Sequence, residues 1–459
     1  MRQSECQLIV NFNYPDDYNM NNPTISQTVN ASCSGTDTAV GHASINKKAI
    51  AAAVAGNALE FYDFVIYAYF AVYIGKAFFP VAGEYGSLMA AVATFGVGFF
   101  ARPLGGILIG AYADRAGRKP AMILTVALIT IGTIGLAMTP SYQSIGVAAP
   151  IIVVICRLIQ GLALGGEVGP ATSLLIEAAP PHRRGFYSSW QIASQGIAVA
   201  VGGVLGVTLS LWLSAEQLQS WGWRVPFLLS LVLIPIVIYM RRELPETHEA
   251  AQERTSTEIV GVVLRDHKKV LVLGILLFAS IGVASQIGNY MVSYAVQVLK
   301  LSAPIAQGSV LVGGVVTFVF ALLGGLLSDR LGRRITNFIP RVILTLAIVP
   351  LFMWLVNAPD LVTLFTVNTV IAALTAMFAT AGLVQIPELL PIAVRSTGLS
   401  LVYALGTAIF GGTTQFIVTW LIAVTNSPMA PAWYLAAISV VSLLAMLFLP
   451  ESKNIDVRK

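Results

Sequence analysis

Charged side chains are scarce in this 459-residue sequence, where Asp, Glu, Lys and Arg together account for 11% of the residues. A soluble globular domain carries about 25%. Hydrophobic residues reach 56%, so the charges are too few to cover a surface that faces water. This shortage excludes an ordinary soluble enzyme and predicts an integral membrane protein, whose surroundings are largely lipid.

Cysteine is also rare, and Cys6, Cys33 and Cys156 form no Cys-x-x-Cys pair or Cys/His cluster. We therefore expect neither a disulfide scaffold nor a metal site. The sequence has no phosphate-binding Gly-rich loop and no arrangement of a nucleophile with a base, so we expect no ATP, no cofactor and no enzymatic activity. The net charge of +5 is spread over short basic clusters, which argues against nucleic acid as a partner.

Long apolar stretches fill the chain after Lys47. The first 45 residues are rich in Asn, Ser, Thr and Asp, a composition typical of a disordered tail. Beyond them we count twelve apolar stretches, each long enough as a helix to cross a hydrocarbon core about 30 Å thick. The predicted fold is therefore all-α and membrane-spanning, with helices over residues 48–76, 85–112, 120–139, 146–178, 186–213, 224–240, 270–299, 305–327, 335–356, 360–387, 397–424 and 431–449.

Basic residues indicate which helix ends face the cytoplasm, because they are retained on that side in short loops. With the N-terminus inside, only Lys76, Arg224 and Lys300 fall in outer loops. The remaining clusters lie inside, at residues 47–48, 115–119, 183–184, 241–242, 265–269 and 330–334. We therefore expect a multi-pass monomer in the lipid bilayer of a plasma membrane, in bacteria the inner membrane, with both termini cytoplasmic.

The chain repeats itself. Residues 110–119 (GAYADRAGRK) recur as residues 325–334 (GLLSDRLGRR), and Pro245-Glu-Thr recurs as Pro450-Glu-Ser. Repeats in the same orientation place a binding site between the two halves near mid-membrane. The predicted organisation is a cytoplasmic tail, two six-helix halves joined by a charged cytoplasmic linker, and a second tail, at residues 1–45, 46–240, 241–269, 270–450 and 451–459.

Several motifs resemble the major facilitator superfamily and, within it, the metabolite:proton symporters. Besides the repeated loop they are residues 56–64 (GNALEFYDF), 102–105 (RPLG), 157–167 (RLIQGLALGGE) and 221–227 (WGWRVPF). Residues 71–80 and 185–191 resemble most closely the citrate and tricarballylate branch, while related branches carry dicarboxylates, shikimate or betaines. The resemblance implies alternating access between two halves, with uptake of a citrate-like tricarboxylate or dicarboxylate driven by protons.

Acidic residues within the apolar stretches are candidates for proton coupling. Asn57, Glu60, Asp63 and Tyr67 fall within an arc of about 120° on the first helix, so we expect their polar groups to share one direction. Carboxylates inside a membrane are costly and often serve proton relays. We predict coupling at Glu60, Asp63 and Glu167. Alternatively, Glu60 and Asp63 only pair with arginines to fix helix packing.

Two arginines within the spans, Arg102 and Arg157, are the main candidates for binding an anion, because guanidinium groups match carboxylate geometry. Structural ion pairing is the alternative. Neutral polar groups that can bind the substrate, or can equally join helices to one another, are Asn57, Tyr67, Gln160, Gln286, Asn289 and Tyr290. We expect Arg341 to extend to the membrane interface instead.

The repeated loop predicts a cytoplasmic gate. Its glycines permit close helix approach, and its aspartate can face a helix N-terminus across the interface between the halves. A purely topogenic role for its basic residues is the alternative. The predicted gate residues are Gly110, Asp114, Arg115, Gly117 and Arg118, with Asp329, Arg330 and Arg333 in the second copy.

Three functions remain open at this point. The first is proton-coupled import of a small organic anion. The second is an exporter of drugs or metabolites driven by proton antiport on the same fold. The third is a membrane sensor or scaffold that transports nothing.

Overall fold

A computed structural model describes residues 47–81, 85–116, 118–165, 172, 175–176, 179–232 and 256–453. The chain divides into two compact units, Met1–Ser44 and Ile45–Lys459, and all described residues lie in the second. In that unit the regular structure of the described residues is entirely helical, which confirms the predicted fold class.

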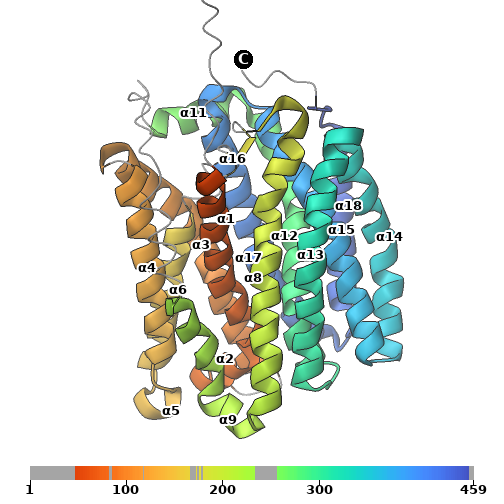
Figure 1. Ribbon diagram of the computed structural model, residues 1–459. Helices are drawn as coiled ribbons and strands as arrows, with labels where there is room; N and C mark the ends of the chain where they lie inside the picture. The colour runs from red at the N-terminus through yellow and green to blue at the C-terminus, as the bar shows by residue number, and fades with distance from the viewer. Residues whose placement is uncertain are drawn as a thin grey trace, which may run out of the picture. The chain divides into compact units, whose positions relative to one another are not determined.

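The first half of the second unit contains both long helices and short connecting ones (Figure 1). In chain order these are α1 Lys47–Tyr69, α2 Ala71–Phe78, α3 Gly86–Ala116, α4 Arg118–Met138, α5 Tyr142–Ile145, α6 Ala148–Leu164, η1 Pro181–Arg183, α8 Arg184–Trp212, α9 Ala215–Ser220 and η2 Gly222–Arg224.

The second half follows a helix in the linker region. In chain order its helices are α11 Ser256–Asp266, α12 Lys268–Gln297, α13 Ala303–Leu331, α14 Arg333–Asn357, α15 Leu361–Glu388, α16 Ile392–Gly406, η3 Thr407–Gly411, α17 Gly412–Thr425 and α18 Ala430–Leu447. Figure 1 shows α11 at one end of the helix bundle and α5 and α9 at the other. The segment 241–269, predicted only as a charged linker, therefore contains a helix, and its last two residues already belong to α12.

Within the described residues, eight helices are long and apolar enough to cross a membrane, and a bent pair formed by α1 and α2 adds a ninth. The other three predicted spans coincide with shorter apolar helices, at Ile123–Met138, Ala148–Leu164 and Gly222–Val232. Each of the twelve predicted apolar stretches thus has a helix in the structure.

Two predicted spans are less regular than expected. The stretch 48–76 breaks at Phe70, where the two helical parts meet at an angle of 66°. The stretch 397–424 contains a five-residue π-helix, Thr407–Gly411, between α16 and α17. Apolar periodicity cannot reveal either feature, because no proline interrupts these stretches and both sides of each irregularity remain hydrophobic.

Small residues bring the two halves into close contact along α8 and α13. A Cβ atom added at Gly196 would lie 2.6 Å from Phe318 N, and one added at Gly203 would lie 2.6 Å from Leu311 Cα. A Cβ at Gly314 would overlap the backbone of Ala200. Glycines at helix contacts let backbones approach closely in membranes, where dispersion contacts replace the hydrophobic effect.

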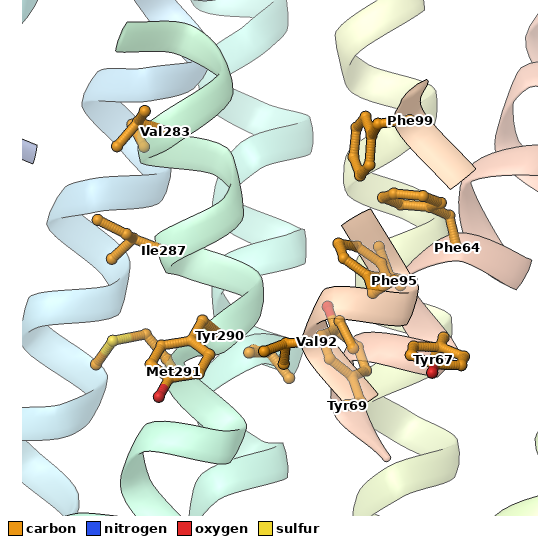
Figure 2. Packing of buried hydrophobic residues seen from close by; sticks show 14 of the residues in the cluster. Phe64, Tyr67, Tyr69, Val92, Phe95, Phe99, Val283, Ile287, Tyr290 and Met291 are labelled. Carbon is orange, nitrogen blue, oxygen red and sulfur yellow. The ribbon is translucent and has the colours of Figure 1, made fainter. Parts of the chain in front are cut away.

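Aromatic side chains pack between α1 and α3. Figure 2 shows Phe64, Phe95 and Phe99 gathered together, with α12, which carries Ile287 and Tyr290, on the other side of the view. The Phe64 ring lies 4.3 Å from the Phe95 ring and 4.6 Å from the Phe99 ring, measured between centroids. The Phe64–Phe99 distance lies within the range of about 4.5 to 7 Å that is typical of aromatic pairs, and the Phe64–Phe95 distance is slightly shorter.

Candidate functional site

A small cavity of about 10 Å³ lies among α1, α3, α4 and α6, in the first half. Glu60, Asp63, Arg157 and Gln160 line it together with apolar residues. The structure therefore brings together two of the three acids predicted for proton coupling and one of the two predicted arginines. We call this space the acid cavity.

Asp63 and Arg157 share the acid cavity without contacting each other directly. Arg157 Nη1 donates to Gln160 Oε1 (2.6 Å), and Gln160 Nε2 donates to Thr133 Oγ1 (2.9 Å). The Thr133 hydroxyl in turn donates to Asp63 Oδ2. Asp63 Oδ1 and two nitrogens of Arg157, Nε and Nη2, have no hydrogen-bond partner. Gln160 is thus held in this bridge, and Thr133 is a site residue that the sequence analysis missed.

Asn57 and Tyr67 do not line the acid cavity, although the Tyr67 ring faces Arg157. The Asn57 side chain bonds with α8, donating to Gln191 O (3.0 Å) and Ser194 Oγ (2.6 Å). The Tyr67 hydroxyl donates to Ala91 O on α3 (3.0 Å). An arc of about 120° on a helix surrounded by others meets several neighbours, so residues within one arc contact different helices.

A larger cavity of about 110 Å³ lies between the halves, and we call it the central cavity. Its wall is built by residues of both halves, from α1, α3, α8, α12, α13, α15, α16 and η3. Among the described residues that line it, Arg102 is the charged one, and Gln286 and Asn289 are also present as predicted. Tyr290 is not in this wall; its hydroxyl accepts a hydrogen bond from Thr419 Oγ1 (2.9 Å).

The central cavity also contains polar residues that the sequence analysis did not select. Gln195, Asn368 and Tyr403 line it, and Gln195 lies next to Tyr403. A lone glutamine or tyrosine in an apolar stretch gives no signal of its own. Only the polar residues of α12, clustered on one face, could be recognised from spacing.

Phe64 separates the two cavities, because it lines both. The Arg102 guanidinium lies 4.8 Å from the Phe64 ring centroid and 4.1 Å from that of Phe99. The Arg157 guanidinium lies 5.6 Å from the same Phe64 ring and 4.0 Å from the Tyr67 ring. Glu60, in the acid cavity, also attracts Arg102. Charges in one cavity therefore act on groups in the other.

Besides the two cavities, a cluster of charged residues lies where α13, α14 and α15 meet α8, at the side predicted to face the cytoplasm. We call it the Asp329 cluster. Asp329 accepts hydrogen bonds from the backbone N–H groups of Gly185 and Phe186 at the start of α8, both at 2.8 Å. Arg333 Nη1 lies 2.8 Å from Asp329 Oδ1, and Arg333 Nη2 lies 3.0 Å from Glu388 Oε1. Arg330, by contrast, is exposed.

The C-terminal end of the described chain extends this cluster. Ser452 Oγ donates to Glu388 Oε2 (2.7 Å), and Glu451 accepts from the backbone N–H groups of Arg333 (2.8 Å) and Arg334 (2.9 Å). Partial burial acts to raise the pKa of Glu451, but backbone N–H donors outweigh it and hold this pKa below its ordinary value. The sequence analysis recognised Pro450-Glu-Ser as the second copy of a repeat. It did not predict that Glu451 caps the start of α14.

Arg341 does not extend to the membrane interface as predicted. Its side chain is fully buried, donating to Leu277 O (3.1 Å) and Asn337 Oδ1 (2.9 Å), and its guanidinium lies 4.6 Å from the Phe378 ring centroid. The expectation was wrong because this face of α14 packs against α12 and α15, which leaves no path to the interface.

Several predicted residues lie outside the described parts of the structure. Glu167 is one of them, and Gly117 is another. The side chains of the remaining first-loop residues are likewise not described, namely Asp114, Arg115 and Arg118, together with the surroundings of Gly110.

Comparison with known proteins places this arrangement in a family. Residues 53–367 match the model of the Major Facilitator Superfamily. A citrate-proton symporter from Salmonella typhi is 37% identical over 411 residues, which cover 88% of this chain and 95% of that protein. A citrate-proton symporter from Klebsiella pneumoniae is 36% identical and covers 87% of this chain and 91% of that protein.

The fold of this chain resembles that of solved transporter structures. The xylose transporter XylE from E. coli, in a partially occluded inward-open conformation, has a TM-score of 0.72 and 19% identity, covering 89% of this chain and 98% of that one. At this identity the likeness concerns the fold alone. The matched model and the two relatives together show that this chain belongs to the Major Facilitator Superfamily of membrane transporters.

Proposed function

We propose that this protein takes up a small organic anion, a citrate-like tricarboxylate or dicarboxylate, together with protons by alternating access. The observation that carries the proposal is the pair of adjoining cavities with the Phe64 ring between them. One cavity holds two carboxylates and a guanidinium, and the other holds a guanidinium among amides and hydroxyls. The likeness to two citrate-proton symporters supports the same substrate class.

The central cavity suits a carboxylate-rich substrate. Arg102 offers a charged, forked donor, which binds carboxylates well. Gln286, Asn289 and Asn368 add amide groups that can donate to further carboxylate or hydroxyl oxygens. Aromatic and aliphatic residues form the rest of the wall, so the charged interactions take place away from bulk water and are strengthened.

The acid cavity suits a proton. Asp63 is buried and has one oxygen without a partner, so a proton can bind there without displacing a hydrogen bond. Protonation removes a negative charge close to Arg157, so the positive charge of this arginine attracts an anion in the central cavity, across the Phe64 ring, more strongly. Release of the substrate then favours release of the proton. Glu60 is the second candidate in this cavity, and Glu167 remains a candidate from the sequence.

The Asp329 cluster is the proposed cytoplasmic gate. It joins the start of α8 in the first half to α13, α14 and α15 in the second, so it can form only while the halves are close on this side. Asp114, Arg115 and Arg118, with Gly110 and Gly117, are proposed as its counterpart. Both termini are proposed to be cytoplasmic, in a bacterial inner membrane.

Counterflow tests this function most simply. The purified protein is reconstituted into vesicles loaded with unlabelled citrate, and entry of labelled citrate, tricarballylate, 2-oxoglutarate and glycine betaine is compared. We expect the carboxylates to exchange and betaine, which has no net charge, not to. Exchange of betaine without any carboxylate would contradict the proposal. An imposed pH gradient, acid outside, separates import from proton-driven export, because only import accumulates label inside.

A further inference from the structure

Two of the three charged groups of the acid cavity, Asp63 and Arg157, are joined by a hydrogen-bond bridge in which all donors point the same way. Each donor in the bridge points from Arg157 toward Asp63, through Gln160 and then Thr133. A guanidinium can only donate and an ionised carboxylate can only accept, so the charges at the two ends determine the direction of every bond between them. Thr133 and Gln160 are themselves neutral and buried.

The bridge also selects the oxygen that takes the proton. Asp63 Oδ2 is occupied by the Thr133 hydroxyl, whereas Oδ1 has no partner. The Ser230 hydroxyl lies against the same carboxylate, but it donates to Phe227 O (2.7 Å). A proton from water therefore forms its O–H bond at Oδ1 and returns to water from there.

Protonation at Oδ1 weakens the bridge from one end. A hydrogen bond to an ionised acceptor is about twice as strong as one between neutral groups. Once Asp63 is neutral, the Thr133 and Gln160 dipoles are no longer aligned by a charge at each end. Arg157 then keeps its positive charge, which attracts an anion in the central cavity across the Phe64 ring.

We propose that Thr133 and Gln160 are positioning residues that couple protonation of Asp63, through the charge of Arg157, to binding of an anion in the central cavity. This inference rests on the proposed function and adds two residues to it. The bridge takes the place of the direct ion pair that the sequence analysis gave as the alternative to proton coupling. It lets Asp63 and Arg157 influence each other without a salt bridge between them.

Other ionisable groups face this bridge and remain unchanged in the tests below. Glu60 lines the same cavity, and Tyr62 lies next to Asp63 on α1. Tyr67, Arg102 and Cys156 act electrostatically on Arg157. A change in pH dependence on altering a neutral bridge residue alone therefore reports on the bridge.

Thr133→Val tests the proposal, because it removes the hydroxyl and keeps the shape of the side chain. Full-length protein in vesicles is assayed with labelled citrate for counterflow, for accumulation driven by a pH gradient, and for the pH at which uptake is half maximal. Loss of a donor to the ionised carboxylate favours the protonated form. We expect half-maximal uptake at higher pH, accumulation reduced by about tenfold, and counterflow within about threefold of wild type.

The same helix offers a matched control. Thr130 lies one turn before Thr133 on α4 and donates only within its own helix, to Val126 O (2.7 Å). Thr130→Val should leave all three readouts unchanged, and Thr133→Ser, which restores the hydroxyl, should behave like wild type. Gln160→Leu should shift the pH profile as Thr133→Val does, and the double variant should add little, since both interrupt one bridge.

The outcomes separate the bridge from the function on which it rests. A wild-type pH profile and wild-type accumulation in Thr133→Val would overturn the proposal while leaving proton-coupled uptake intact. If Thr133→Val is not recovered in folded form, Gln160→Leu carries the test, and a wild-type pH profile there overturns the proposal equally. A wild-type protein that accumulates no carboxylate against a gradient would instead contradict the proposed function.

Discussion

At the scale of single residues, the Asp329 carboxylate joins the two halves of the transporter. It accepts two backbone N–H groups at the start of α8, where the partial positive charge of the helix dipole lies, and it contacts Arg333 of its own half. Charge-assisted hydrogen bonds of this kind contribute about 1.5 to 3 kcal/mol each. The contact is therefore strong enough to influence how long one conformation lasts.

Asp329→Asn should slow transport without changing recognition of the substrate. The amide keeps one acceptor oxygen but loses the charge, which destabilises the state in which the halves are close on this side. We expect turnover to fall by about tenfold, corresponding to about 1.4 kcal/mol, with the substrate dissociation constant within about twofold of wild type. Arg330→Gln is the matched control, since Arg330 lies next in sequence but is exposed. A large loss of affinity with unchanged turnover would argue against a gate.

Some of these residues could be predicted from the sequence and others could not, for physical reasons. Glu60, Asp63, Arg102 and Arg157 stood out because charge inside an apolar stretch is costly and rarely accidental. Thr133 did not, since a threonine in a membrane helix usually bonds to its own backbone, as Thr130 does. Its partner was determined by how α4 packs against α1 and α6, which no single stretch of sequence contains.

At the scale of helices, contacts between small residues explain why α8 and α13 approach so closely. Gly314→Ala should push these helices apart, because its methyl group would overlap the backbone of Ala200. Overpacking costs about 1 to 3 kcal/mol. We expect a lower melting temperature in detergent and slower exchange.

Gly261→Ala provides the comparison within the same protein. Gly261 lies in α11, and nothing lies within 4 Å of a Cβ atom added there. This change should be neutral or stabilise the helix by up to roughly 1 kcal/mol. Equal melting temperatures for the two variants would show that the α8 and α13 contact is looser than described.

The N-terminus of α15 gives a pH-dependent prediction. Asp360 accepts a hydrogen bond from the backbone N–H of Thr363 (2.7 Å), and this bond lowers the pKa of Asp360 below its ordinary value. A carboxyl group whose pKa is lower in the folded state stabilises the fold above its unfolded pKa, about 3.9, and loses that contribution as pH falls through the folded value. Asp360→Ala should therefore lower the melting temperature at pH 7.

The gap between wild type and Asp360→Ala should narrow once the pH drops below about 4, because the wild-type carboxyl group is then increasingly protonated. Asp360→Asn, which keeps an N-cap acceptor, should lose less than Asp360→Ala at pH 7. A gap that is independent of pH between 7 and 3 would mean that the charge of Asp360 is not involved. Thermal unfolding in detergent gives the melting temperatures of wild type, Asp360→Ala and Asp360→Asn.

The helices also show which structural features the hydrophobic pattern does not predict. Hydrophobic stretches predicted the number and approximate bounds of the elements because a bilayer demands about 20 apolar residues per crossing. The break at Phe70 and the π-helix at Thr407–Gly411 lie inside such stretches and have mainly apolar residues on both sides. Such irregularities depend on contacts between helices, and the π-helix directly borders the central cavity through Thr407 and Gly411.

At the scale of the whole molecule, the predicted topology can be tested by labelling. In a variant with its native cysteines replaced, Arg265→Cys in α11 and Glu216→Cys in α9 place reporters on exposed residues at opposite ends of the bundle. An impermeant thiol reagent added to intact cells should label residue 216 and leave residue 265 unlabelled until the cells are opened. Labelling of residue 265 from outside would show that the orientation is the opposite of the proposed one.

The central claim is that a proton bound in the acid cavity drives uptake of an anion bound in the central cavity. Asp63→Asn cannot bind or release that proton, but exchange between equally loaded compartments needs no net proton movement. The decisive measurement compares pH-driven accumulation of labelled citrate with citrate exchange in the same vesicles, for wild type and for Asp63→Asn. The account predicts that the variant exchanges citrate but does not accumulate it, and wild-type accumulation by Asp63→Asn, and likewise by Glu60→Gln and Glu167→Gln, would contradict it.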